Sequence, residues 1–208
     1  GVRTFEELRR KAPRLRIAAS PDDGTNTIGF ATQRVMEFAG LPRATVESWG
    51  GAYIERERPN ECVGMVREGQ ADAVIHEAIM AGWWRDLADA MDIAFLPMEE
   101  AVLARMEREY RWPRASLPDG YLRGMAGPFA TLDFSDFLVI ARADLPDDLA
   151  YLIAWCMCER REAIERGYRH IPPERSPLTY PLVPQKIATT TIPLHPGAER
   201  YYRAAKLI

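Results

Sequence analysis

The sequence has few of the side chains that most often support covalent chemistry or metal binding, since its 208 residues include only three cysteines and three histidines. An odd number of cysteines excludes a framework in which every thiol forms a disulfide. Cys156 and Cys158 lie two residues apart in an expected helix and point in different directions, which disfavours a bond between them. We expect Cys62, Cys156 and Cys158 to be small buried apolar groups, and we predict no metal site.

The chain also lacks an excess of basic charge and a long hydrophobic run. Its 27 basic and 30 acidic residues give a net charge of -3, whereas a nucleic-acid-binding protein normally carries a basic stripe. We therefore predict no nucleic-acid partner. No apolar run approaches the roughly 18 residues that span a bilayer, and no signal peptide is recognisable. Because the chain does not begin with Met, the lack of a targeting segment does not argue for a cytoplasmic location.

What the first half does contain is an alternation of strand-like and helix-like segments. The apolar run Ala71–Ile75 is typical of a strand whose two faces are both covered. In the segment 27–40, apolar residues recur at steps of three and four, as in an amphipathic helix. Strands are expected at 15–19, 45–49, 71–75 and 93–96, and helices at 27–40, 60–68 and 83–90. This order favours a mostly parallel sheet with helices on both sides.

The second half has a different pattern. A helix is expected at 99–110, and the Pro- and Gly-rich segment 111–130 is expected to be a loop. Phe134–Arg142 is a strong strand candidate. The longest helix is predicted at Leu145–Glu165, with Asp144 as its N-cap. Pro196 opens the last helix, where the missing N–H of proline would be unpaired in any case.

Several segments resemble one known family. The run Leu194-His195-Pro196-Gly197-Ala198-Glu199-Arg200 resembles the C-terminal signature of the TAXI family, the solute-binding receptors that feed TRAP-type transporters. Further similar segments occur in the family's order, at 17–25, 68–73, 117–121 and 145–151. The resemblance therefore covers nearly the whole chain. It has two departures: Asp22 and Asp23 stand where small neutral residues are usual, and the region that precedes Gly1 in the family is absent.

The resemblance implies an α/β fold with the periplasmic-binding-protein-like (type II) two-lobe architecture. One α/β lobe would be complete and the other partial. Residues 14–132 would form the second lobe, and residues 133–208 would be the C-terminal part of the first lobe, with a crossover strand and helices. In that case apolar side chains of the helix at 145–165, namely Leu149, Ile153 and Cys156, should be more exposed than core residues usually are.

The function implied by the resemblance is that of a periplasmic, or otherwise extracytoplasmic, receptor. It would capture a small organic acid or amino acid and deliver it to the membrane subunits of a TRAP-type transporter, without catalysis and without a cofactor. One alternative is an enzyme of the related precursor-synthase type, which would need a lysine or a reactive histidine in its cleft. The other alternative is the ligand-sensing domain of a regulator, which a DNA-binding segment upstream of Gly1 would favour.

The turn 20–26 is the first candidate binding segment, because it leads from a strand into a helix. A helix N-terminus suits a carboxylate or phosphate, and glycine permits close approach of the backbone. The resemblance places this turn in the cleft, so Asp23, Gly24, Thr25 and Asn26 are candidate ligand-binding residues. A plain helix cap is the alternative. The acidic groups of the turn would either repel an anion or bind the ammonium group of an amino acid.

Three further candidates depend on the rule that open α/β sheets bind ligands at the carboxyl ends of their strands. Trp49 ends the expected strand 45–49, although it suits the core equally well. Glu77 follows the expected strand 71–75, where a carboxylate could orient an amine or hydroxyl, and Trp83 could cover an apolar body or a cation. His76 beside Glu77 suggests acid–base or metal chemistry only weakly, because no other histidine lies at metal spacing.

His195 is a tempting catalytic residue, but the sequence offers it no nucleophile elbow and no recognisable carboxylate partner. We expect its ring to form a hydrogen bond with the backbone where the last helix begins. Tyr201 and Tyr202 are expected to be packing residues of that helix.

Overall fold

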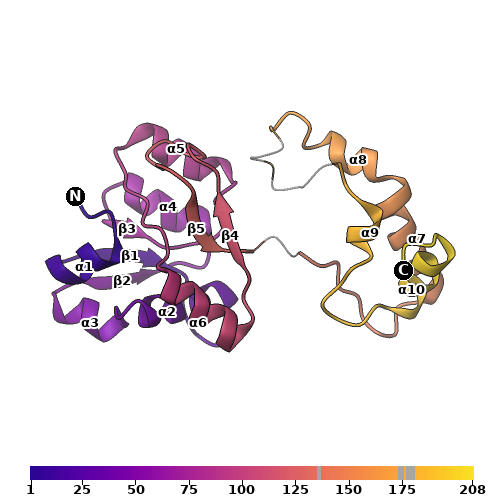
Figure 1. The fold of residues 1–208 in the computed structure, drawn as a ribbon, viewed down its shortest axis with the longest axis horizontal. Helices are drawn as coiled ribbons and strands as arrows, with labels where there is room; N and C mark the ends of the chain where they lie inside the picture. The colour runs from indigo at the N-terminus through magenta and orange to yellow at the C-terminus, as the bar shows by residue number, and fades with distance from the viewer. Residues whose placement is uncertain (135–136, 173–175, 177–180) are drawn as a thin grey trace. The chain divides into compact units, whose positions relative to one another are not determined.

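The computed structural model describes residues 1–134, 137–172, 176 and 181–208 of the chain. The chain divides into two compact units, Gly1–Phe134 and Ser135–Ile208 (Figure 1). The assignment of 14–132 and 133–208 to two lobes of one receptor remains a prediction.

A three-stranded parallel sheet forms the centre of the first unit. Its strands are β1 (Arg16–Ala19), β2 (Ala52–Glu55) and β3 (Ala73–Val74), in the order β2-β1-β3. The pairing continues for one residue beyond β3, since the Ile75 amide donates to the carbonyl oxygen of Ala18 at 3.1 Å. The predicted parallel α/β arrangement is confirmed for this unit.

Helices cover both faces of the sheet, as Figure 1 shows. Successive strand residues point to opposite faces, so the neighbours Ile17 and Ala18 belong to two different hydrophobic cores. The Ile17 core is built with α1 (Phe5–Lys11), α2 (Thr27–Phe38), α3 (Arg43–Ser48) and α6 (Glu100–Tyr110). The Ala18 core is built with α4 (Pro59–Arg67), α5 (Gly82–Ala90) and the segment around Tyr121–Met125. This burial explains why Ile17, Ala18 and Ala19 of β1 are small or apolar.

The predicted strand at 45–49 is wrong, because this segment lies in and directly after helix α3. Its Val46 side chain is buried in the Ile17 core. A single buried side chain can be placed there by a helix or by a strand, so it does not distinguish the two. Strand pairing starts only after the glycine turn, where the Ala52 amide donates to the Leu15 carbonyl oxygen at 2.8 Å. At Gly51 a Cβ atom would lie 2.6 Å from that same oxygen, so the turn needs glycine.

The predicted strand at 93–96 is also wrong, since this segment belongs to no sheet. Its apolar side chains are shared between the two cores, with Ile93 and Phe95 in one and Leu96 in the other. The predicted loop 111–130 instead contains β4 (Arg114–Leu117) and the start of β5 (Phe129–Leu132), which pair antiparallel. The segment 93–96 has the sequence pattern of a strand because its apolar side chains are half-buried in the two cores.

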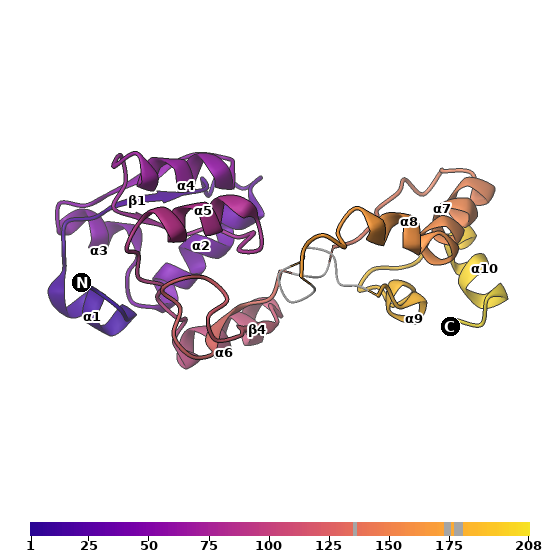
Figure 2. The same ribbon diagram turned by 90° about the horizontal axis from the view of Figure 1, so that it is seen from above.

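The described part of the second unit contains helices and no strand. These helices are α7 (Asp147–Glu159), α8 (Arg161–Arg166), α9 (Pro184–Ile187) and α10 (Pro196–Ala204). Helices α7 and α10 lie side by side (Figure 2). Gly197 of α10 lies close to the start of α7, because a Cβ atom there would collide with the Asp147 carbonyl oxygen. Tyr201 and Tyr202 are buried in this small core, as predicted.

Two predictions for the second unit need correction. Phe134 and residues 137–142 do not form a strand, while 135–136 lie outside the described residues. Phe137 is 79% exposed, and a strand requires a pairing partner that the described part of this unit does not supply. The predicted helix 145–165 is divided at Arg160 into α7 and α8, and Pro146 rather than Asp144 occupies the N-cap position.

The surface of α7 is apolar, as predicted. Leu149 is 49% exposed and Ile153 is 42% exposed, and Cys156 is exposed as well. The prediction of a buried thiol is confirmed for Cys62 and Cys158 and is wrong for Cys156. None of the helices in the described residues is long and apolar enough to cross a membrane.

Candidate functional site

The carboxyl ends of all three parallel strands lie at one edge of the sheet. Because the strands run in the same direction, the segments 20–26, 56–58 and 75–81 leave the sheet side by side. The Arg56 amide donates to the Ala19 carbonyl oxygen at 3.0 Å, which extends the pairing of β1 and β2 to this edge. Open α/β sheets bind their ligands at such an edge, and we call it the carboxyl edge.

The turn between β1 and α2 is held by its own side chains. The Asp23 carboxylate accepts hydrogen bonds from the backbone amide of Thr25 (2.9 Å), the Thr25 hydroxyl (2.8 Å) and the Asn26 amide (3.2 Å). These bonds lower the pKa of the Asp23 carboxyl group. Asn26 caps α2 by accepting from the amides of Ile28 and Gly29, both at 3.0 Å. The turn is therefore preformed, and Asp23 occupies the position that an external anion would take at these amides.

His76 connects the end of β3 to the end of β1. Its Nε2 atom lies 2.9 Å from the Ser20 hydroxyl oxygen, and its Nδ1 accepts a hydrogen bond from the Glu77 amide at 2.9 Å. Ser20 is fully buried, and the side chain of His76 is 1% exposed. Burial lowers the pKa of His76 to about 4, because a charged imidazolium loses its hydration there. The imidazole is therefore neutral at pH 7.

Glu77 lies on the open side of this connection. Its side chain is 21% exposed, and partial burial raises the pKa of its carboxyl group. Its carbonyl oxygen accepts a hydrogen bond from the indole nitrogen of Trp84 at 3.0 Å. Ala78 follows with φ of +60°, a left-handed conformation that costs a non-glycine residue about 1–2 kcal/mol. The hydrogen bond from Trp84 therefore helps to hold the loop after β3 in a backbone conformation that Ala78 alone would not favour.

Trp83 is a predicted ligand-binding residue, and the structure shows different surroundings for it and for its neighbour Trp84. Trp83 is 36% exposed in the first turn of α5, whereas Trp84 is buried in the Ala18 core. The spacing of Trp84 to Leu87 and Ala88 is the helical pattern of a buried face, and it could have identified Trp84 in advance. The role of Trp83 in ligand binding stays a prediction.

Trp49 does not join the other candidates. It lies at the end of α3, before β2 begins, and it packs partly buried against the Ile17 core. The amino ends of parallel strands lie at the edge opposite to the carboxyl edge. The strand that was expected to bring Trp49 to the ligand is absent, so the structure supports the packing interpretation of this residue.

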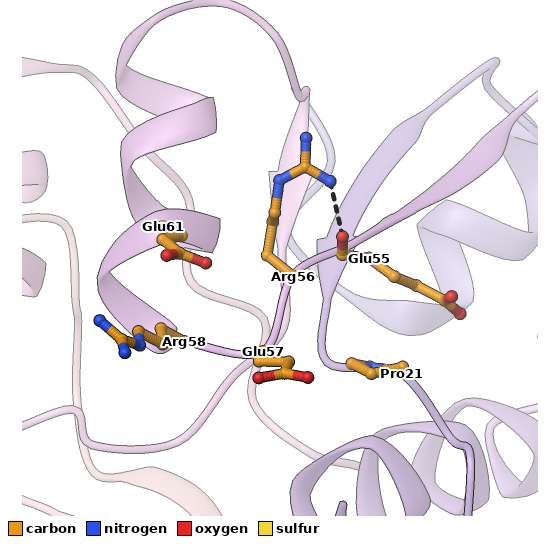
Figure 3. Close-up of a pocket in the computed structure, with 6 residues that line it drawn as sticks. All are labelled: Pro21, Glu55, Arg56, Glu57, Arg58 and Glu61. Carbon is orange, nitrogen blue, oxygen red and sulfur yellow. Dashed lines mark hydrogen bonds between the residues drawn. The ribbon is translucent and has the colours of Figure 1, made fainter.

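A cavity that the sequence patterns do not predict opens at the carboxyl edge (Figure 3). It is shallow, measures about 500 Å³, and is lined by Pro21, Glu55, Arg56, Glu57, Arg58 and Glu61. The carboxylate of Glu55 is paired with Arg43, and Arg56 donates to the Glu55 carbonyl oxygen at 2.7 Å. The charged residues Arg56, Glu57 and Arg58 directly follow β2. A correct prediction of β2 from the sequence would therefore have placed them at the carboxyl edge.

The second unit contributes a predicted structural histidine. The Nδ1 atom of His195 accepts a hydrogen bond from the Gly197 amide at 3.2 Å, so this ring caps α10 as expected.

In the part of the chain that the structure describes, no three His, Cys, Asp or Glu side chains gather as a metal-binding group would.

The chain matches the model of a known protein family. A family model described as the NMT1-like family matches residues 18–205, from β1 to α10. The chain belongs to the NMT1-like family. This is a periplasmic binding-protein-like family related to the TAXI solute-binding proteins. A comparison with curated proteins gives no match.

Membership of the NMT1-like family indicates a substrate-binding role outside the cytoplasm, with a small molecule as ligand. The parallel sheet of this NMT1-like protein is consistent with a binding-protein-like fold. Its carboxyl edge combines a preformed turn at Asp23–Asn26, a partly exposed Glu77 and a cavity with charges of both signs. Such an edge can bind a small polar molecule through several hydrogen bonds and ion pairs.

Proposed function

We propose that this NMT1-like protein is a solute-binding receptor of the TAXI type. It captures a small organic acid or amino acid and delivers it to the membrane subunits of a TRAP-type transporter. The family match over residues 18–205 carries the proposal. The run Leu194–Arg200, which resembles the TAXI signature, lies within the matched range and supports the finer assignment.

The ligand binds at the carboxyl edge in this proposal. Asp23, Thr25 and Glu77 supply polar groups there, and Trp83 supplies an aromatic face. The cavity adds charges of both signs. Among the described residues, the side chains of Glu57, Arg58 and Glu61 form no ion pair, so they are available to a ligand. The ammonium group of an amino acid could pair with Glu57 or Glu61, and its carboxylate could pair with Arg58. These charges of both signs favour an amino acid over a simple dicarboxylate as the ligand.

Binding occurs without turnover in this proposal. Both ring nitrogens of His76, the histidine nearest to the edge, are engaged by Ser20 and the Glu77 amide. A catalyst of proton transfer needs a ring nitrogen within reach of the ligand. We therefore expect the ligand to be recovered unchanged after incubation with the protein, as judged by mass spectrometry.

Calorimetric titration with a panel of amino acids and dicarboxylates tests the proposal. A panel member should bind, and Thr25→Ala and Arg58→Gln should each weaken it by about 1 kcal/mol or more, the scale of one lost polar contact. Thr189→Ala, which changes an exposed threonine in the second unit, is the control and should have no effect. Absence of any binder in the panel, or a binder insensitive to both edge variants, would contradict the proposal.

The transport role has a separate test in cells. Deletion of the gene should abolish uptake of the identified ligand, and a plasmid copy should restore uptake. A copy carrying Arg58→Gln should restore uptake only at a higher ligand concentration, because it binds more weakly. Unchanged uptake in the deletion strain would contradict delivery to a transporter even if binding is confirmed.

A further inference from the structure

A chain of hydrogen bonds links all three segments of the carboxyl edge. The Trp84 indole donates to the Glu77 carbonyl oxygen at 3.0 Å, the Glu77 amide donates to His76 Nδ1 at 2.9 Å, and His76 Nε2 lies 2.9 Å from Ser20 Oγ. Ser20 Oγ is in turn 3.5 Å from the carbonyl oxygen of Glu57, which follows β2. The ends of β1, β2 and β3 and the start of α5 are therefore joined through two buried side chains.

The direction of these hydrogen bonds follows from one fixed donor. A backbone N–H can only donate, so the Glu77 amide requires an unprotonated Nδ1 on His76. A neutral imidazole carries one proton, which must then be on Nε2, and this N–H donates to the Ser20 oxygen. The Ser20 hydroxyl therefore donates its own proton to the backbone carbonyl oxygen of Glu57.

This polarity is opposite to that of a nucleophile and its general base. In a catalytic Ser–His pair, the ring nitrogen accepts the serine proton and thereby activates the oxygen. Here the ring donates to that oxygen and leaves it less nucleophilic. Ser20 is also fully buried, so a substrate carbonyl group has no access to it. The short distance between Ser20 and His76 is therefore a structural connection.

We propose that His76 is the positioning residue of the ligand site: as its Nε2–H tautomer it fixes the end of β3 against the end of β1. It thereby holds the loop of Glu77 at a constant distance from the turn of Asp23. The inference rests on the proposed function only in naming these two loops as the ligand site. Fixing them before the ligand arrives lowers the ordering cost of binding, which is the general benefit of preorganisation.

The tautomer can be measured without any ligand. Long-range ¹H–¹⁵N correlation spectra of the full chain should show His76 protonated at Nε2 and unprotonated at Nδ1 from pH 8 to pH 5. The variants His76→Asn and His170→Asn assign the signals, since His170 is exposed. An Nδ1–H tautomer or a charged His76 at pH 6 would overturn the proposal. Labelling of Ser20 by a fluorophosphonate, which reacts with activated serines, would also overturn it.

Hydrogen exchange separates positioning from a general effect on stability. In Ser20→Ala, the amides of Arg56 and Ile75 at the strand ends should exchange at least tenfold faster, whereas amides in the middle of α6 should keep their rates. His76→Asn should give the same local pattern, because asparagine can replace Nδ1 but cannot reach Ser20. The double variant should add little to either single variant. Uniform acceleration across the unit, or no acceleration at the edge, would contradict positioning.

Ligand affinity provides the functional readout, with L-glutamate and succinate as probes. For a probe that binds the unmodified protein, His76→Asn should raise the dissociation constant about tenfold, and His76→Gln, whose amide can donate to Ser20, should recover part of the loss. Unchanged affinity in His76→Asn would overturn the role of His76 in the ligand site. If neither probe binds the unmodified protein, the proposed function loses its support, while the spectra and exchange rates still decide the role of His76.

Discussion

At the scale of single residues, His76 makes the stability of the protein depend on pH. The folded chain lowers the pKa of His76 to about 4, whereas an unfolded histidine titrates near 6.5. Between these values the unfolded chain binds more protons, so the free energy of unfolding should fall as the pH is lowered from about 6.5 to about 4. The full loss from this group is about 3 kcal/mol. Urea denaturation at several pH values measures it.

The matched variant for this prediction is His76→Asn, which removes the titrating group. Burial raises the pKa of the neighbouring Glu77, so this carboxyl group acts in the opposite direction and stabilises the fold as the pH falls. Because the variant retains Glu77, the difference between the two pH curves isolates His76. Parallel curves for the two proteins would show that His76 is not the group responsible.

Asn26 is the residue whose side chain begins α2. Its Oδ1 accepts from two amides, and loss of an N-cap typically costs about 0.5–2 kcal/mol. We expect Asn26→Ala to lower the free energy of unfolding by about 1 kcal/mol or more. Asn60→Ala is the control, because Asn60 lies in the first turn of α4, whose N-terminus has no side-chain cap. Equal losses in the two variants, measured by denaturant titration, would contradict a specific cap.

At the scale of elements, the contact of α2 with the turn before it depends on one glycine. A Cβ atom at Gly29 would collide with the Pro21 carbonyl oxygen, while one at Gly64 in α4 would meet nothing within 4 Å. Gly29→Ala should therefore destabilise the protein by about 3 kcal/mol or more, in the upper range for point variants. Gly64→Ala should stabilise it by up to about 1 kcal/mol, because alanine favours a helix. Thermal denaturation measures both effects, and equal changes in Tm for the two variants would contradict the contact at Gly29.

Elements also show where sequence patterns succeed. Helix α2 was predicted almost to its ends, because one face is buried along its whole length and the spacing of apolar residues records that burial. The segment 45–49 was assigned wrongly, since one buried residue, Val46, suits a helix and a strand equally. That error moved β2 and hid the charged cavity at its end, so an error of one element became an error in the site.

At the scale of the whole molecule, the two units have separate cores. The cores of the first unit are built around Ile17 and Ala18, and that of the second unit around Cys158 and Tyr201. We expect calorimetry to resolve two unfolding transitions. Gly29→Ala should lower the midpoint of one, and Gly197→Ala, which disrupts the contact of α10 with α7, should lower the other. A single transition shifted by both variants would indicate one cooperative unit instead.

The sequence by itself determined the parallel α/β class of the first unit, the capping role of His195 and the membership of a binding-protein family. These properties depend on local periodicity and on short motifs, which are visible along the chain. Only the tertiary structure decided that His76 bonds to Ser20, that the Trp84 indole bonds to the Glu77 carbonyl oxygen, and that Trp49 lies near the amino ends of the strands. Ser20 and His76 are 56 residues apart, and their meeting follows from the register of β1 with β3, which no local pattern contains.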